Sequence, residues 1–181
     1  MSNIDSLAQK LTQLRDEKMD SFGWSEGSLA AIGREIASFL EPGSLLADDR
    51  IEPDPNERRK IPLWSAEDGS FTILATIWAP KQNTPIHDHE YWDVSGMIAG
   101  VLLETHYEAD PAIGDVAIPR RSVYHHPGDV WSVSPQRPNI HTLVNPTSEI
   151  AVALNVHGTG ATNFERNTSR VFRLDGRFDH D

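Results

Sequence analysis

The sequence predicts a mainly β fold, in which an antiparallel β-barrel of the jelly-roll type follows two N-terminal α-helices. Three observations support this prediction: two apolar stripes with helical spacing near the N-terminus, a series of short apolar runs from Phe71 onward, and Gly, Pro or Asp residues between those runs. A chain of 181 residues is most simply one domain. We expect a helical segment over residues 1–45 and the barrel over residues 60–175.

Two stretches carry apolar residues at intervals of three and four, the spacing that places side chains on one face of an α-helix. The stripes comprise Ile4, Leu7, Leu11 and Leu14, and then Leu29, Ile32, Ile36 and Leu40. We expect Asn3 or Asp5 to cap the first helix. We expect Ser25 to cap the second helix and Pro42-Gly43 to end it. Both stripes are predicted to cover one face of the barrel.

The predicted strands are short runs of apolar and β-branched residues. The clearest of them span residues 71–78, 94–105, 130–133, 140–144 and 150–157. A tight turn is expected between a strand that carries His87 and His89 and the second of these runs. We interpret the charged, proline-containing segment over residues 48–60 as a solvated linker into the barrel, whose basic end could also contribute to an anion-binding rim.

Composition limits the classes of function. The chain has no Cys, so the fold needs no disulfide bonds. Its formal net charge of −11 argues against nucleic acid or an anionic membrane as a partner. The N-terminus has no basic region followed by an apolar core, and no apolar run reaches the roughly eighteen residues of a membrane span. Cytoplasm is the expected location.

Three histidines are the main functional signal. His87 and His89 lie in a segment expected to be a strand, where residues two apart project from the same face. His141 follows in a later predicted strand. Three neutral imidazoles can hold one divalent metal ion and leave coordination positions open. Iron, zinc, copper and nickel all accept such ligands, and zinc with three imidazoles and a water would generate hydroxide near neutral pH.

The spacing around these histidines resembles the first motif of the cupin superfamily, G-x5-H-x-H-x3,4-E-x6-G. Here His87-x-His89 is followed at the motif's intervals by Asp93, in place of Glu, and by Gly100. His141 and Asn145 match the H-x3-N that ends the second cupin motif. The resemblance implies a small cupin-type antiparallel barrel with a metal ion in the barrel mouth.

Within the cupins, the chain resembles the thiol dioxygenases, the family of cysteine and 3-mercaptopropionate dioxygenases. The residues that carry this resemblance are Trp78 and the runs 85–89, 100–105, 128–130 and 141–145. It implies that His87, His89 and His141 bind Fe(II) and that O2 oxidises the thiol of a small organic mercapto compound to a sulfinate. A small-molecule thiol and O2 are then the expected partners.

Two regions depart from the thiol dioxygenase pattern. Ile61 aligns with the arginine that binds the substrate carboxylate in cysteine dioxygenases, although the basic run 58–60 precedes it. Ala153, Asn155 and His157 stand where the family has Ser-x-His-x-Tyr, a hydrogen-bonded triad near the iron. Strand alternation puts these three side chains on one face, so we predict catalytic roles for Asn155 and His157. The alternative for His157 is a partly buried structural residue at the end of a strand.

Asp93 is the third departure, and we include it among the catalytic candidates. Thiol dioxygenases usually have Cys or Gly at this position, whereas most other cupins have a Glu that ligates the metal. Asp is one methylene shorter than Glu, so Asp93 could act on the metal through a bridging water or through hydrogen bonds to the metal ligands. As a direct ligand, Asp93 would occupy a position that a thiol substrate needs.

Six further residues are candidates for lining the pocket. Arg166 and Arg170 follow the last clear strand, where mercaptopropionate-type enzymes place the arginine that binds the substrate carboxylate. Tyr91 and Trp92 lie beside the ligand strand and are predicted either as a wall of the pocket or as ordinary core. His125-His126 point to opposite faces of a strand, so at most one of the two could face the metal.

Two alternative functions remain beside thiol oxidation. One is a metal-dependent cupin enzyme of other chemistry, such as a C–C cleaving dioxygenase, an isomerase or a lyase, with Asp93 as a fourth ligand. The other is a non-catalytic cupin that binds a small molecule. A binding module does not require a full set of three metal ligands, so His87, His89 and His141 together weigh against it.

Overall fold

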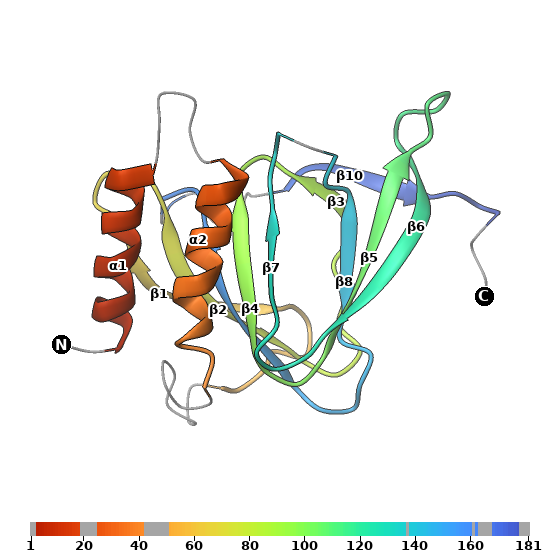
Figure 1. Ribbon diagram of the computed structural model, residues 1–181. Helices are drawn as coiled ribbons and strands as arrows, with labels where there is room; N and C mark the ends of the chain where they lie inside the picture. Colours follow the sequence, from red (N-terminus) through yellow and green to blue (C-terminus); the bar gives the residue numbers. More distant parts are fainter. Residues whose placement is uncertain are drawn as a thin grey trace.

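The chain folds into two β-sheets and two N-terminal helices (Figure 1). The computed structural model describes residues 3–18, 25–41, 51–136, 138–160, 162 and 168–177. In chain order the elements are α1 (Asn3–Lys18), α2 (Glu26–Ala37), β1 (Arg59–Ser65), β2 (Thr72–Trp78), β3 (Ile86–His89), β4 (Asp93–Ala99), β5 (Leu102–Ala109), β6 (Val116–His125), β7 (Val130–Val133), β8 (His141–Val144), β9 (Ala151–His157) and β10 (Thr168–Leu174).

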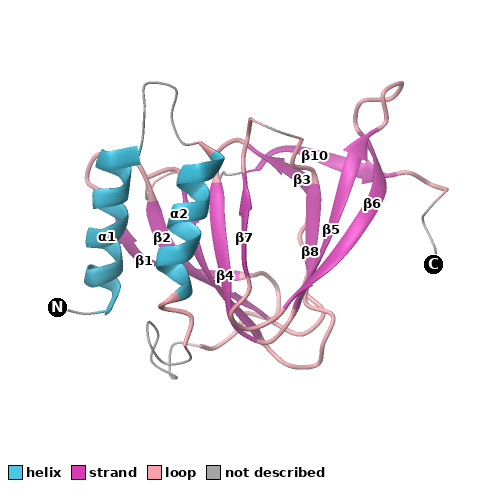
Figure 2. Cartoon of the chain, in the orientation of Figure 1, coloured by secondary structure: helices cyan, strands magenta, loops and turns pink. Residues whose placement is uncertain are grey.

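The ten strands of the described residues form two sheets, which the cartoon shows (Figure 2). One sheet has the order β1-β2-β9-β4-β7, and the other has the order β10-β3-β8-β5-β6. Strand β10 also pairs in parallel with β6, which closes the second set into a ring, while the neighbouring pairs are antiparallel. The predicted mainly β barrel with two N-terminal helices is therefore confirmed.

Helix α2 begins where its sequence predicts, whereas Asn3 and Asp5, the expected caps of the first helix, both lie inside α1. The hydroxyl of Ser25 accepts a hydrogen bond from the backbone N–H of Ser28 at 3.2 Å, which caps α2. Helix α1 begins at Asn3 and has Asp5 in its first turn. The predicted end of the second helix at Pro42-Gly43 lies outside the described residues. Neither helix has the length and apolar character that crossing a membrane requires.

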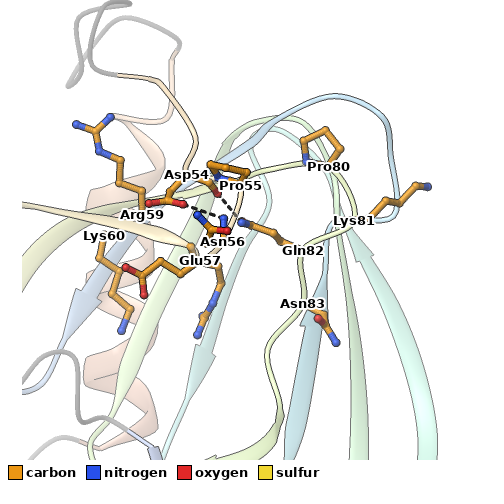
Figure 3. A pocket seen from close by; sticks show the side chains of 11 residues that line it. Asp54, Pro55, Asn56, Glu57, Arg59, Lys60, Pro80, Lys81, Gln82 and Asn83 are labelled. Atoms are coloured by element: carbon orange, nitrogen blue, oxygen red, sulfur yellow. Dashed lines mark hydrogen bonds between the residues drawn. The ribbon is translucent and has the colours of Figure 1, made fainter.

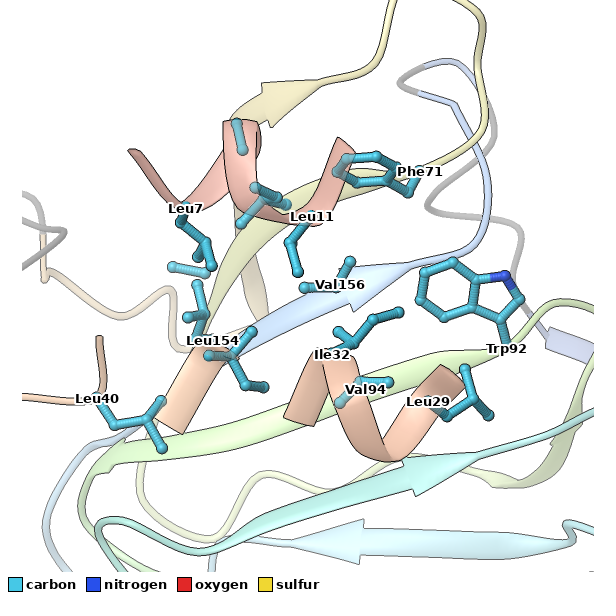
Figure 4. Close-up of a cluster of buried hydrophobic side chains, with 14 of the residues drawn as sticks. Leu7, Leu11, Leu29, Ile32, Leu40, Phe71, Trp92, Val94, Leu154 and Val156 are labelled. Carbon is cyan, nitrogen blue, oxygen red and sulfur yellow. The ribbon is translucent and has the colours of Figure 1, made fainter. Parts of the chain in front are cut away.

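The helices cover the outer face of the first sheet, and a buried apolar cluster fills the space between them (Figure 4). Alternation along the strands separates this cluster from the barrel interior. On β9, for example, Leu154 and Val156 belong to the cluster, whereas Asn155 and His157 line a cavity on the other side. The predicted stripes of both helices thus bury the back of the sheet that carries part of the site.

The turn between β4 and β5 requires glycine. Gly100 has a φ of +74°, and a Cβ on this residue would lie 2.4 Å from the carbonyl oxygen of Ile150. The apolar run over residues 94–105, predicted as one strand, is therefore two strands joined by a tight turn.

Three strands lie where the sequence patterns did not predict any. Residues 59–60, predicted as part of a solvated linker, begin β1, in which Lys60 pairs with Thr76 of β2. Strands β6 and β10 carry many charged and exposed residues, so their apolar alternation is weak. Pairing with neighbouring strands supplies their backbone hydrogen bonds and decides their structure.

Candidate metal centre

Three imidazoles meet at one point on the inner face of the second sheet. His87 and His89 project from the same side of β3, and His141 on β8 pairs directly with His87. The three rings offer nitrogen atoms that all lie within 4.8 Å of one another. His87 and His141 are buried and His89 is half-buried. Within the described part of the chain, this is the group of side chains that could hold a metal ion.

Two of the rings are held by hydrogen bonds at their Nδ1 atoms. Nδ1 of His87 lies 2.9 Å from the carbonyl oxygen of Pro85, which can only accept, so this nitrogen donates. Nδ1 of His141 lies 2.5 Å from Oε1 of Glu104. The Nε2 atoms of both rings are therefore the ones left for a metal ion.

The distance between two ring nitrogens fits a bound cation. Nε2 of His89 lies 2.8 Å from Nε2 of His141. Two lone pairs at this distance repel unless a proton or a cation lies between them. Nitrogen ligands in neighbouring positions on one metal, each at about 2.1 Å, lie about 3 Å apart. Nδ1 of His89 is buried without a hydrogen-bond partner, so its contacts leave this ring free to change tautomer when a metal binds.

Burial keeps two of the rings neutral. It lowers the pKa of His87 to about 4, and the charge of His141 acts in the same direction. Burial and the charge of His141 also hold the pKa of His89 well below its usual range. Imidazole must be unprotonated to bind a metal, so both ligands are ready at neutral pH.

Glu104 is a functional candidate that sequence reasoning missed. This buried carboxylate lies behind His141 and also forms a hydrogen bond with Nε2 of His125 at 2.8 Å. Burial alone would raise the pKa of Glu104, but hydrogen bonds from His106, His125 and His141 outweigh it and hold the pKa well below its usual range. The available signal was an acidic residue on the same face of a strand as the buried Leu102.

The opposite wall of the cavity is a chain of hydrogen bonds that ends at a carboxylate. Thr76 Oγ1 donates to Asn155 Oδ1 at 2.7 Å, and Asn155 Nδ2 donates to Ser95 Oγ at 2.6 Å. Ser95 Oγ then donates to Oδ1 of Asp93 at 2.5 Å. The second carboxylate oxygen of Asp93 lies 2.6 Å from Nε2 of His157. Strands β2, β4 and β9 thus position one continuous polar network.

This pairing separates Asp93 from the three imidazoles. Both oxygens of Asp93 are engaged, and the carboxylate is not part of the group that could bind a metal. Burial would raise the pKa of Asp93, but the charge and hydrogen bond of His157 outweigh it and lower the pKa to about 2. The geometry therefore favours a contact of Asp93 with His157 over direct ligation of the metal.

The two walls enclose a small cavity of about 60 Å³, lined on one side by the three imidazoles and on the other by Asp93, Asn155 and His157. Arg58 and Lys60 also line it. The guanidinium of Arg58 lies 4.9 Å from the centre of the Trp78 ring, and burial lowers the pKa of this arginine. Nε1 of Trp78 is buried without a hydrogen-bond partner.

A larger cleft of about 770 Å³ lies on the surface next to this cavity (Figure 3). It is formed by the segments 54–60 and 80–83, and Nε2 of Gln82 donates to the carbonyl oxygen of Asp54 at 2.6 Å across it. Arg58 and Lys60 line both the cleft and the inner cavity. These two cations therefore stand where the surface cleft meets the metal centre.

The other predicted pocket residues lie elsewhere. Arg170 pairs with Asp88, its Nε and Nη2 atoms lying 2.9 and 2.8 Å from Oδ2, and it does not line the cavity. Trp92 packs in the apolar cluster beneath the helices, and Tyr91 is half-buried in the loop before β4 and does not line the cavity. Arg166 lies outside the described residues.

Neither member of the pair His125-His126 faces the metal centre. His125 donates to Glu104 and stacks on Trp131, with ring centres 4.0 Å apart. His126 is exposed. Adjacent strand residues point in opposite directions, and the buried residue of this pair, His125, bonds Glu104.

Comparison with known proteins found similar structures, while no protein-family model matches the chain. A protein from Thermus thermophilus is 18% identical, with a TM-score of 0.48 over 64% of this chain and 97% of that chain. A Cupin 2 conserved barrel domain protein from Salinispora arenicola is 23% identical, with a TM-score of 0.44 over 67% and 90%. An oxalate oxidase in complex with the substrate analogue glycolate is 14% identical, with a TM-score of 0.45 over 64% and 59%.

Proposed function

We propose that this protein is a mononuclear iron(II) dioxygenase that oxidises the thiol of a small mercapto acid to a sulfinate. The observation that carries the proposal is a centre of three imidazoles in which the nearby carboxylate, Asp93, is already paired with His157 and Ser95. Three protein ligands leave positions for both a thiolate and O2, whereas a fourth would take one of them. The sequence resemblance to thiol dioxygenases supports the same reaction.

The residues of the chain have separable tasks in this reaction. His87, His89 and His141 would hold the iron(II), and the bound metal would supply the redox chemistry by which both oxygen atoms of O2 are transferred to sulfur, so that RSH plus O2 becomes RSO2H. The substrate thiol must lose its proton to bind as a thiolate. The Asp93–His157 pair lines the same cavity as the imidazoles and is the group we assign to receive that proton. Ser95 and Asn155 hold Asp93 in place.

Charge at the mouth of the cavity favours a substrate with a carboxylate. Arg58 and Lys60 line both the inner cavity and the surface cleft, so an anionic group can contact them while the rest of the molecule reaches the imidazoles. The buried Nε1 of Trp78 offers one more hydrogen-bond donor at this wall. A cavity of about 60 Å³ accommodates only a small molecule.

Oxygen uptake tests the reaction directly. The protein is loaded anaerobically with Fe(II) and then exposed to O2 with cysteine, cysteamine, 3-mercaptopropionate or mercaptosuccinate. We expect O2 consumption matched one to one by sulfinate with a carboxylate-bearing thiol. Absence of uptake with every thiol, from protein shown to hold one iron per chain, would refute the proposal.

Substitution of Arg58 tests the substrate class. Arg58→Met should raise the KM for the best mercapto acid about 10- to 100-fold, because a charged hydrogen bond to the carboxylate is lost. The KM for cysteamine, which has no carboxylate, should stay unchanged. Arg120→Met is the matched control, since Arg120 is exposed, pairs with Glu108 and lines neither the cleft nor the cavity. Equal effects on both thiols would show that Arg58 does not bind the carboxylate.

A further inference from the structure

Glu104 occupies the centre of a cluster of histidines on the outer side of the metal centre. Its strand, β5, lies between β8, which carries His141, and β6, which carries His125. Register places Glu104 opposite Leu143 on one side and Val123 on the other, so each histidine is its diagonal neighbour. The side chain is 2% exposed and does not line the inner cavity.

Three ring nitrogens surround the two carboxylate oxygens of Glu104. Nδ1 of His141 lies 2.5 Å from Oε1, Nε2 of His125 lies 2.8 Å from Oε2, and Nε2 of His106 lies 3.3 Å from Oε2. A carboxyl group carries at most one proton, so at least two of these rings must donate to it. His141 makes the shortest of the three contacts and has Oε1 to itself.

We infer that Glu104 is a positioning residue that keeps His141 in its Nδ1–H tautomer, with the lone pair of Nε2 directed toward His89 and the metal centre. The tautomer of an imidazole ligand is set by the hydrogen bond that its other nitrogen makes. With Nδ1 of His141 protonated, the proton between the two Nε2 atoms at 2.8 Å belongs to His89 in the metal-free protein. Binding of a metal then requires only His89 to change its proton, and its Nδ1 atom has no partner to hinder this.

His125 keeps Glu104 in this position. The His125 ring stacks on Trp131 at 4.0 Å with an angle of 19° between the planes, and Trp131 in turn lines the inner cavity. The contact to Oε2 at 2.8 Å prevents Glu104 from turning away from His141. The inference rests on the proposed function only in that the same His141 serves as a ligand.

The ring nitrogens of His141 provide the first test, because they can be observed in wild-type protein without metal. Their 15N chemical shifts, assigned by comparison with His141→Gln, should report a proton on Nδ1 and none on Nε2. A proton on Nε2 would overturn the inference. This measurement needs neither a metal nor a thiol, so its result is independent of whether the protein oxidises thiols.

Metal affinity provides the second test. In Glu104→Met no acceptor remains for the Nδ1–H of His141, so the Kd for Co(II), measured by competition with a chelator, should rise about 10- to 100-fold. Glu108→Met is the control, because Glu108 lies on the same strand, is exposed and pairs with Arg120. It should leave the Kd unchanged.

The outcomes of these two tests are distinguishable. A folded Glu104→Met protein with wild-type affinity for Co(II) would overturn the inference. If the variant does not fold, the wild-type tautomer decides. If wild-type protein binds no Co(II), the metal centre of the proposed function fails, and the tautomer of His141 still decides the role of Glu104.

Discussion

Each of the two walls of the inner cavity contains a histidine bonded to a carboxylate, but the carboxylate lies outside the cavity in one wall and inside it in the other. In the wall made by β3, β8 and β5, the carboxylate of Glu104 lies behind His141 and outside the cavity, so that the ring faces inward. In the wall made by β4 and β9, Asp93 and His157 both line the cavity and are bonded to each other.

This difference determines what each pair can do. A carboxylate behind the ring binds Nδ1 and leaves Nε2 for a metal ion. A carboxylate beside the ring inside the cavity occupies Nε2 and gives a hydrogen-bonded pair in which a neutral ring can take up a proton from a substrate. The first wall is therefore the metal-binding wall and the second the proton-transfer wall in our proposal.

Loss of a ligand from the metal-binding wall should have the largest effect. His141→Ala removes one of three nitrogen donors, so we expect metal affinity to fall by more than about 100-fold, beyond the effect of altering a residue behind a ligand. The metal content of purified protein, measured by mass spectrometry after loading and desalting, checks this. His126→Ala changes an exposed histidine and should keep the metal. Full retention of metal in His141→Ala would disprove the site.

Loss of the titratable ring from the proton-transfer wall should slow turnover without loss of metal. In His157→Gln the side chain amide can still donate to Asp93 but cannot take up a proton, so kcat should fall about 10²-fold. Metal content should match that of wild type. His126→Gln serves as the control for the substitution itself. If kcat is unchanged, the Asp93–His157 pair is structural and does not transfer protons.

Acidification should destabilise the metal-free protein through the buried rings. The pKa of His87 is lowered from 6.5 to about 4, so folding favours its neutral form. The stability that results is fully present above pH 6.5 and is lost as the pH falls toward 4, by about 3 kcal/mol from this residue. Urea unfolding at several pH values between 7.5 and 4.5 measures this loss. His87→Gln should have a flatter profile, and a wild-type profile without slope would contradict the burial of neutral imidazole.

Much of the fold could be predicted because its elements are locally consistent. The stripes of α1 and α2 and the Ser25 cap each depend on nearby residues. Strands β1, β6 and β10 could not be predicted, since their charged and exposed residues give weak alternation and pairing with other strands supplies their backbone hydrogen bonds. Arg59 and Lys60 have the charge typical of a solvated linker, and their pairing with β2 makes them part of a strand.

The site shows the same limit. Strand alternation brings His87 and His89 together from sequence alone, and the motif resemblance adds His141. The partners behind them are tertiary: Glu104 bonds His141 from the neighbouring strand β5, and Arg170 is held by Asp88 from the neighbouring strand β3. Trp92, adjacent to the site in sequence, faces the helices because the chain turns before β4.

The metal affinity of Asp93→Asn tests the distinction between the two walls most directly. The substitution keeps the shape of the side chain and removes its charge, so a carboxylate that ligates the metal would be lost as a strong ligand. We predict that the Kd for Fe(II), measured anaerobically, stays within about threefold of wild type, because Asp93 is bonded to His157 and Ser95 and not to the metal. A loss of affinity as large as that caused by His141→Ala would show that Asp93 is a fourth ligand and would contradict the account.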